Sequence, residues 1–159
     1  MNSDPVAASN PANSTDASIG IVVSDWHSEI TSAMLESAVA TLKQCGVSEE
    51  DICISHVPGA MELTFAARQM SNVQESNAVI MLGCVVKEDN PQYESIIRSV
   101  TQGYTHLNLH GDSPYIFGIL TVDTLEQAKK LVAGEENQGA QCARAALNMA
   151  NMMAKLIYD

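Results

Sequence analysis

Apolar residues follow two alternating patterns along the chain. Four short runs are nearly continuous in apolar character and rich in valine and isoleucine, and they span residues 19–23, 52–57, 78–86 and 115–120. Such runs are typical of strands covered on both faces, as in a parallel sheet. The segments between them are longer, and their apolar residues recur with the 3.6-residue period of amphipathic helices.

The helical segments carry recognisable start and stop signals. The first has one apolar stripe over residues 30–42 and is expected to end at Gly46, and a shorter helix is expected over 61–70. Asn90 and Pro91 predict the N-cap and the first helical position of the third helix. The apolar face of this third helix is formed by Ile96, Ile97, Val100, Tyr104 and Leu107.

Two further helices are expected near the end of the chain. Thr124 and Gln127 form a capping-box pattern that predicts the start of the fourth. Gly139 is expected to precede the last helix, whose methionines are interpreted as core filler. The predicted apolar side of the last helix consists of Cys142, Ala145, Ala146, Met149, Met153 and Leu156.

Strand and helix thus alternate four times, and an extra helix follows. This order predicts an α/β domain of flavodoxin-like type over residues 18–159, with three layers, a four-stranded parallel sheet and an extra C-terminal helix. Residues 1–17 contain mainly Ala, Ser, Asn, Asp and Pro. They bury too little apolar surface to offset the entropy cost of ordering, which predicts a flexible N-terminal arm.

Composition narrows the functional classes. The 159 residues include 8 Lys+Arg and 19 Asp+Glu, for a formal net charge of −11. No basic stripe is available to neutralise phosphates, so neither nucleic acid nor an anionic membrane surface is an expected partner. No apolar run approaches the roughly twenty residues of a membrane span, and no export signal is visible. Four cysteines without a C-x-x-C pair predict reduced thiols and a cytoplasmic protein.

Ligands of parallel α/β sheets bind beyond the carboxyl ends of the strands, which directs attention to residues 24–28, 58–62, 87–92 and 121–124. The first of these segments has no glycine-rich phosphate loop, which argues against a flavodoxin-type flavin site. A response-regulator receiver needs an aspartate after the third strand and a lysine after the last, but Gly83-Cys84 and Thr121 occupy those places. Trp26 has two open interpretations: its ring stacks on a heteroaromatic ligand, or it covers the edge of the sheet.

Several stretches match one protein family in order and spacing. These stretches are residues 20–26, 57–63, 82–86, 100–103, 117–121, 123–124, 126–128 and 148–150. Together they resemble lumazine synthase over about residues 19–156. The resemblance implies condensation of 5-amino-6-ribitylaminouracil with 3,4-dihydroxy-2-butanone 4-phosphate, which forms 6,7-dimethyl-8-ribityllumazine in riboflavin biosynthesis. It also implies no metal or organic cofactor, and homopentamers that sometimes form 60-subunit icosahedral shells, with active sites shared between neighbouring subunits.

The half of the family site that holds the aminouracil is intact or conservatively filled. The matching positions are Trp26, Ala60, Met61, Glu62, Val85, Val86 and Phe117. By resemblance, Trp26 stacks on the pyrimidine and the turn at residues 60–62 meets the ribityl chain and the ring edge. The two valines line the ring pocket, and Phe117 closes it from the adjacent subunit.

The half that binds phosphate and moves protons departs from the family pattern. The positions concerned are Glu88, Asp89, Asn90, Gln92, Leu131 and Gln138. They replace, in that order, a glycine, a variable residue, a threonine, the proton-handling histidine, an arginine and a lysine. We expect the two acidic residues to lie at the positive end of the third helix, where they repel phosphate. His27 replaces a family asparagine and is a candidate substitute base.

Two functional hypotheses remain open at this stage. One is a lumazine synthase with weakened phosphate binding and proton transfer, which works mainly through orientation of its substrates. The other is a catalytically retired family member that serves as an oligomeric shell or binds a flavin-like or pteridine-like ring. His56, His106 and His110 are interpreted as ordinary residues of a strand and of a helix surface.

Overall fold

The computed structural model describes residues 16–88 and 90–158, and four parallel strands form its centre. The strands are β1 (Ile19–Ser24), β2 (Ile52–Val57), β3 (Ala78–Val86) and β4 (Tyr115–Val122), in the spatial order β2-β1-β3-β4. The predicted sheet is therefore confirmed, with β1 one residue and β4 two residues longer than expected. Residues 1–15 of the expected arm lie outside the described residues. Ala17, at the end of that arm, is buried in the core.

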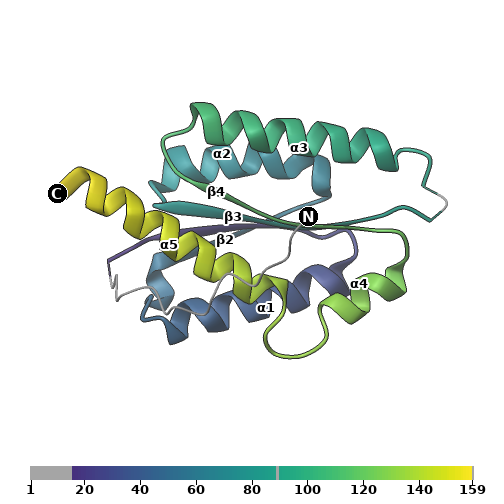
Figure 1. The fold of residues 1–159 in the computed structure, drawn as a ribbon, viewed down its shortest axis with the longest axis horizontal. Helices are drawn as coiled ribbons and strands as arrows, with labels where there is room; N and C mark the ends of the chain where they lie inside the picture. Colours follow the sequence, from purple (N-terminus) through teal and green to yellow (C-terminus); the bar gives the residue numbers. More distant parts are fainter. Residues whose placement is uncertain (1–15, 89, 159) are drawn as a thin grey trace.

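Five helices cover the sheet in two outer layers (Figure 1). They are α1 (Ser28–Gln44), α2 (Leu63–Gln74), α3 (Tyr93–His110), α4 (Leu125–Leu131) and α5 (Gln138–Tyr158). One core cluster joins α1 and α5 to one sheet face, and a second joins α2 and α3 to the other. The three-layer α/β fold is thus confirmed. No helix in the described part of the chain is long and apolar enough to cross a membrane.

The C-terminal end of α1 and the N-terminal end of α4 agree with their sequence signals. Gly46 has φ 95°, and the backbone N–H groups of Gly46 and Val47 donate to the carbonyls of Lys43 and Leu42. This is the pattern of a helix closed by a left-handed glycine, as expected. At α4 both halves of the capping box are present between Thr124 and Gln127.

The predicted start of α3 is wrong by two residues. Pro91 lies in a turn, and the helix begins at Tyr93 with Gln92 as its N-cap. Asn90 nevertheless acts as a local cap, because its Oδ1 accepts a hydrogen bond from the backbone N–H of Gln92 at 3.0 Å. The asparagine therefore closes a turn before the helix and does not cap the helix itself.

The predicted start of α5 is wrong, and its predicted apolar side is correct only in part. Gly139 lies inside the first turn of the helix, and Met149 and Leu156 are exposed. The predicted Cys142 and Ala146 are buried, and the rest of the buried face consists of Gly139, Ala140, Ala143, Leu147 and Ala150. Small residues occupy this face because α5 runs close against α1: a Cβ at Gly139 would overlap the carbonyl oxygen of Met34.

The expectation that every strand is covered on both faces fails for β2. Strands β1 and β3 are buried at every position, but β2 lies at the edge of the sheet and its central residues are exposed. Ile54, for example, is 41% exposed. A short apolar run does not reveal whether its strand is central or at an edge, because this depends on the spatial order of the strands, β2-β1-β3-β4.

Candidate functional site

A cavity of about 570 Å³ opens beyond the carboxyl ends of β1, β2 and β3, where the strand order predicts a ligand. Its walls come from three segments that follow these strands and from the start of α3. The lining residues are Trp26, His27, Gly59, Ala60, Met61, Glu62, Cys84, Val85, Val86, Glu88, Asn90, Gln92 and Ile96.

Most of the candidates from the sequence lie together in this cavity, including all those in the turn at residues 60–62. Phe117, Leu131 and Gln138 do not line it. Asp89 lies outside the described residues. The lining residues that sequence reasoning did not select are Gly59, Cys84 and Ile96. The first two sit inside the matched stretches, so their neighbours carried the signal, and Ile96 belongs to the predicted apolar face of the third helix.

The β1 and β2 ends are held together at the mouth of the cavity. The backbone N–H of Asp25 donates to the carbonyl of Val57 at 2.8 Å, and that of Trp26 donates to Pro58 at 3.0 Å. These bonds continue the pairing of the two strands and place Trp26 beside the turn that begins at Gly59. The indole is 63% exposed, so it covers little of the sheet edge and offers a flat apolar surface to a ligand.

The turn after β2 presents its backbone and one carboxylate to the cavity. Residues Ala60–Glu62 form a 3₁₀ turn, closed by the Glu62 N–H donating to the carbonyl of Gly59 at 3.3 Å. Helix α2 follows without a break. Glu62 and Met61 are exposed, the latter by 52%, so both side chains are available to a bound molecule.

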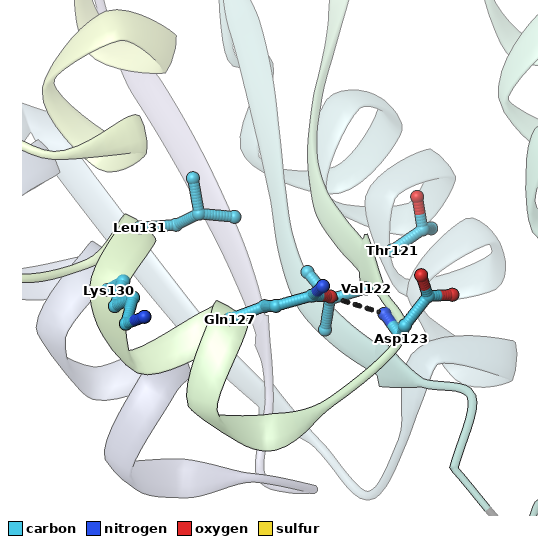
Figure 2. A pocket seen from close by; sticks show the side chains of 6 residues that line it. All are labelled: Thr121, Val122, Asp123, Gln127, Lys130 and Leu131. Atoms are coloured by element: carbon cyan, nitrogen blue, oxygen red, sulfur yellow. Dashed lines mark hydrogen bonds between the residues drawn. The ribbon is translucent and has the colours of Figure 1, made fainter.

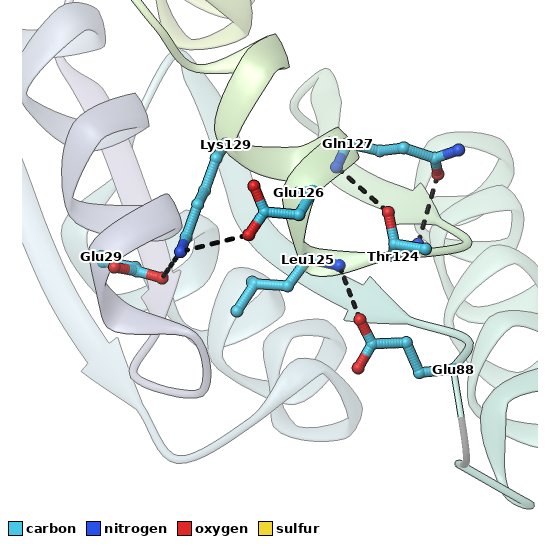
Figure 3. A network of polar contacts seen from close by, with 7 residues as sticks. All are labelled: Glu29, Glu88, Thr124, Leu125, Glu126, Gln127 and Lys129. Carbon is cyan, nitrogen blue, oxygen red and sulfur yellow. Dashed lines mark hydrogen bonds and ion pairs between the residues drawn. The ribbon is translucent and has the colours of Figure 1, made fainter.

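Glu88 is placed differently from the sequence-based expectation. Its Oε1 accepts a hydrogen bond from the backbone N–H of Leu125 at 2.9 Å, so the carboxylate lies at the start of α4 (Figure 3). The predicted position at the positive end of α3 is therefore wrong. Glu88 also has φ 27°, a left-handed backbone conformation that favours glycine. Its contact with α4 fixes the loop between β3 and α3 against the next strand-to-helix connection.

The loop before α3 satisfies its own backbone donors. The N–H of Gln92 donates to Asn90 Oδ1, and the N–H of Tyr93 donates to the Asn90 carbonyl at 3.2 Å. Free N–H groups at a helix start are what attracts an anion. At α3 two of them are already engaged by Asn90, which lowers the capacity of this helix end to hold phosphate.

His27 is the one imidazole that lines the cavity. It has φ 56° and ψ 52°, a left-handed conformation, and its carbonyl accepts from the N–H groups of Ile30 and Thr31 at the start of α1. Desolvation lowers the pKa of His27 below its usual value, and the carboxylates of Glu88 and Glu29 partly oppose that shift. The ring is therefore mainly neutral at pH 7 and able to accept a proton.

The charge of the cavity is negative. Glu62 and Glu88 are its charged residues, and neither Lys nor Arg occurs among the residues that line it. Lys87 is exposed and does not line the cavity, although its backbone N–H donates to the carbonyl of Val122 at 2.8 Å. Cys84 is a poor nucleophile here, because burial raises the pKa of its thiol to about 11.

The candidates outside the cavity lie at other surfaces of the same chain. Leu131 is 51% exposed at the end of α4 and lines a separate hollow of about 400 Å³, next to Lys130 (Figure 2). Gln138 is the first residue of α5. Phe117, on β4, packs edge-on against Tyr104 with ring centroids 5.0 Å apart.

Known proteins resemble this chain over nearly its whole described length. A family model described as 6,7-dimethyl-8-ribityllumazine synthase matches residues 16–154. The enzyme of that name from Parabacteroides distasonis is 43% identical over 143 residues, which cover 89% of each chain. The one from Bacteroides fragilis is 44% identical over 138 residues, which cover 86% of this chain and 96% of the relative. The match therefore includes every segment that lines the cavity, and the chain belongs to the 6,7-dimethyl-8-ribityllumazine synthase family.

Proposed function

We propose that the chain binds the ring of 5-amino-6-ribitylaminouracil in the cavity and condenses it with 3,4-dihydroxy-2-butanone 4-phosphate, with weakened phosphate binding and proton transfer. The family membership supports the reaction. The observation that carries the weakening is the lining of the cavity, which contains two carboxylates and neither Lys nor Arg.

The ring half of the proposal rests on apolar walls and a few polar groups. Trp26 supplies one flat face, and Val85 and Val86 form the floor at the end of β3. Glu62 offers a carboxylate to the N–H groups or hydroxyls of the aminouracil. A pocket of this kind, apolar with a small number of polar groups, is typical of small-molecule sites.

The phosphate half lacks the charges that a dianion needs. A charge-assisted hydrogen bond contributes about 1.5–3 kcal/mol. In the family pattern two such bonds come from the arginine and lysine positions, which are Leu131 and Gln138 here. The loss of both bonds weakens phosphate binding by about 3–6 kcal/mol. The Glu88 carboxylate adds repulsion, although its bond to Leu125 disperses part of its charge.

Proton transfer falls to His27 in this proposal. Gln92 donates and accepts hydrogen bonds but does not titrate, and loss of a general acid–base residue costs about 10²–10⁴ in rate. A neutral His27 accepts in turn each of the two protons that the substrate amine nitrogen loses, and passes each to the former ketone oxygen, which leaves as water as the imine forms. Orientation of the two substrates supplies the rest of the acceleration.

A second candidate is a ring binder without turnover, the retired family member. The specific observation in its favour is that backbone donors at the start of α3 are engaged by Asn90 and those at the start of α4 by Glu88 and Thr124. At both helix starts, some of the backbone N–H groups that could hold phosphate therefore already donate to residues of this chain. Under this alternative the cavity holds a lumazine-like or flavin-like ring, and phosphate never binds productively.

The decisive experiment follows product absorbance with both substrates, against a buffer blank that measures the spontaneous reaction. We expect turnover above the blank, with saturation by the aminouracil at much lower concentration than by the phosphate substrate. A rate equal to the blank excludes the enzyme and leaves the ring binder. Quenching of Trp26, the single tryptophan, reports ring binding independently of turnover, and no quenching by either ring excludes both candidates.

A restored phosphate site provides the complementary test. The triple variant Gln92→His, Leu131→Arg, Gln138→Lys is expected to lower the KM for the phosphate substrate by at least about tenfold, because it returns two cations and a titrating group. The matched control is Lys130→Arg, which alters the same end of α4 without adding charge. If the triple variant leaves the KM unchanged, the phosphate site has been assigned to the wrong positions.

We also propose that the chain assembles with itself, as a homopentamer or a 60-subunit shell, in the cytoplasm. Large apolar side chains are exposed along α2, at Phe65 and Val73, and the edge strand β2 exposes Ile54. Unpaired sheet edges and apolar helix faces are common at interfaces between subunits. Light scattering of the purified chain separates a monomer, a pentamer and a shell.

A further inference from the structure

The last turns of α3 carry two histidines that have no part in the proposed function. His106 and His110 are one helical turn apart, and both are exposed. Their ring centroids are 4.4 Å apart with an angle of 46° between the planes. Residues at i and i+4 share a helix face, so the pair is set by the backbone. Neither imidazole forms a hydrogen bond or ion pair with another residue in the described ranges.

We propose that His106 and His110 form a bidentate site for a divalent transition-metal ion, with copper(II) bound most tightly. An imidazole nitrogen ligates such an ion at about 2.0–2.1 Å, which places the ring centre about 3.1 Å from the metal. Two rings at a right angle around one ion then have centres about 4.4 Å apart. The ring centres of His106 and His110 have this same separation in the structure.

The surroundings define the kind of ion and its strength of binding. The pair lines a small hollow of about 240 Å³ together with Asp112, whose carboxylate favours a cation, and Arg68, whose charge opposes one. No group of three or more His, Cys, Asp or Glu side chains in the described part of the chain is arranged to hold a metal. Two imidazoles with water in the other positions give modest affinity, which follows the usual order with copper(II) above nickel(II) and zinc(II).

The site is separate from the cavity of the proposed function. Ile96 lines that cavity near the start of α3, and His110 follows 14 residues later at the other end of the same helix. At 1.5 Å per residue, the two lie about 21 Å apart along the helix axis. Metal binding and ring binding can therefore be measured independently, and failure of one does not imply failure of the other.

The test is a copper(II) titration of the full, untagged chain by calorimetry, at a slightly alkaline pH and in a buffer that does not chelate. We expect one site per chain of modest affinity that exceeds any other, and a loss of at least about tenfold in affinity for His106→Ala and for His110→Ala, because each removes the chelate. His56→Ala is the matched control, since it removes an exposed imidazole from another element and should leave this site intact.

Two results would overturn the proposal. One is equal copper affinity of the wild type and both single variants, which would assign binding to the N-terminal amine or to scattered groups. The other is an electron paramagnetic resonance spectrum of the copper-loaded wild type with only one coordinated imidazole nitrogen, since the bidentate site requires two. Unchanged circular dichroism of the variants establishes that loss of affinity is not loss of fold.

Discussion

Replacement of Gly139 by alanine is expected to force α5 away from α1. A Cβ at this position would overlap the carbonyl oxygen of Met34 and lie 2.8 Å from its carbonyl carbon and 3.0 Å from its Cα. Optimal carbon–carbon contact is about 3.5–4.0 Å, so the two helix backbones must separate by about 1 Å. Backbone atoms of a buried helix have no rotamer with which to move aside, so the whole interface shifts.

Three contributions set the expected loss in the free energy of unfolding for Gly139→Ala. Overpacking of a tight contact costs about 1–3 kcal/mol. Asn137 joins the two helices: its Nδ2 donates to the carbonyl of Ala33 at 3.1 Å, and its backbone N–H donates to Ser37 Oγ at 3.3 Å. A separation of the helices weakens both bonds, at about 1 kcal/mol each. Alanine returns about 1 kcal/mol through its higher helix propensity. The net loss is about 3 kcal/mol.

Urea unfolding followed by circular dichroism measures this loss, with wild type and variant at the same protein concentration. In a chain of this length, about 3 kcal/mol also lowers Tm by about 6–12 °C. Gly59→Ala is the control for glycine replacement as such, because its Cβ would meet only Glu62 Oε2, at 3.6 Å, in an extended backbone. A Gly139→Ala protein within about 0.5 kcal/mol of the wild type would refute the close approach of the two helices.

Three further predictions concern titrating groups. Burial raises the pKa of Cys84 to about 11 and that of Cys142 to about 12. A thiol reagent should therefore modify only Cys45 and Cys53 until the chain unfolds, and rapid modification of all four cysteines would contradict this. The pKa of His27 is lower in the folded chain, so the free energy of unfolding should fall as the pH drops below about 6.5. His27→Asn should reduce that fall, as measured by urea unfolding at two pH values. Glu88→Gln should lower the pKa of His27 further, as read by NMR, because a raising charge is removed; an increase would contradict it.

The strands and the packing faces of α1 and α3 were accessible from sequence because their signals are local. A continuous apolar run needs no knowledge of the rest of the chain, and β2 and β3 begin and end at the predicted residues. The face of α1 also follows from periodicity, with Ile30, Met34 and Leu42 all buried. The exposure of β2 was not accessible, because it depends on which strand lies at the edge.

The face of α5 was predicted only in part, for a related reason. Periodicity alone allows more than one apolar stripe on this helix, and large side chains such as Met149 and Leu156 drew the prediction toward the wrong one. The close crossing with α1 selects small residues instead, as at Ala143 and Gly139. Side-chain size carries information about packing distance, which a count of apolar residues does not use.

The candidate site also has parts that local sequence signals predict and parts that they do not. Residues next to one another in the chain, such as Ala60 and Met61, were brought together correctly because each group follows one strand and parallel strands end on one side. Phe117 and Leu131 lie elsewhere on the chain. The resemblance implies active sites shared between neighbouring subunits, with Phe117 closing the site of the adjacent one. A single sequence contains no local signal for such contacts, so these two assignments rest on the resemblance alone.

Glu88 shows why a change of residue type does not by itself reveal a change of function. The sequence suggests a carboxylate added to the phosphate site, but the left-handed backbone directs its side chain to the start of α4, where it accepts from Leu125. The Glu88 carboxylate therefore occupies a backbone donor at the start of α4 with an internal hydrogen bond. Asn90 acts in the same way at the start of α3. Backbone N–H groups that already donate to Glu88 or Asn90 are not available to phosphate. Addition of cations at residues 131 and 138 alone should therefore restore less phosphate affinity than the triple variant combined with Glu88→Gly.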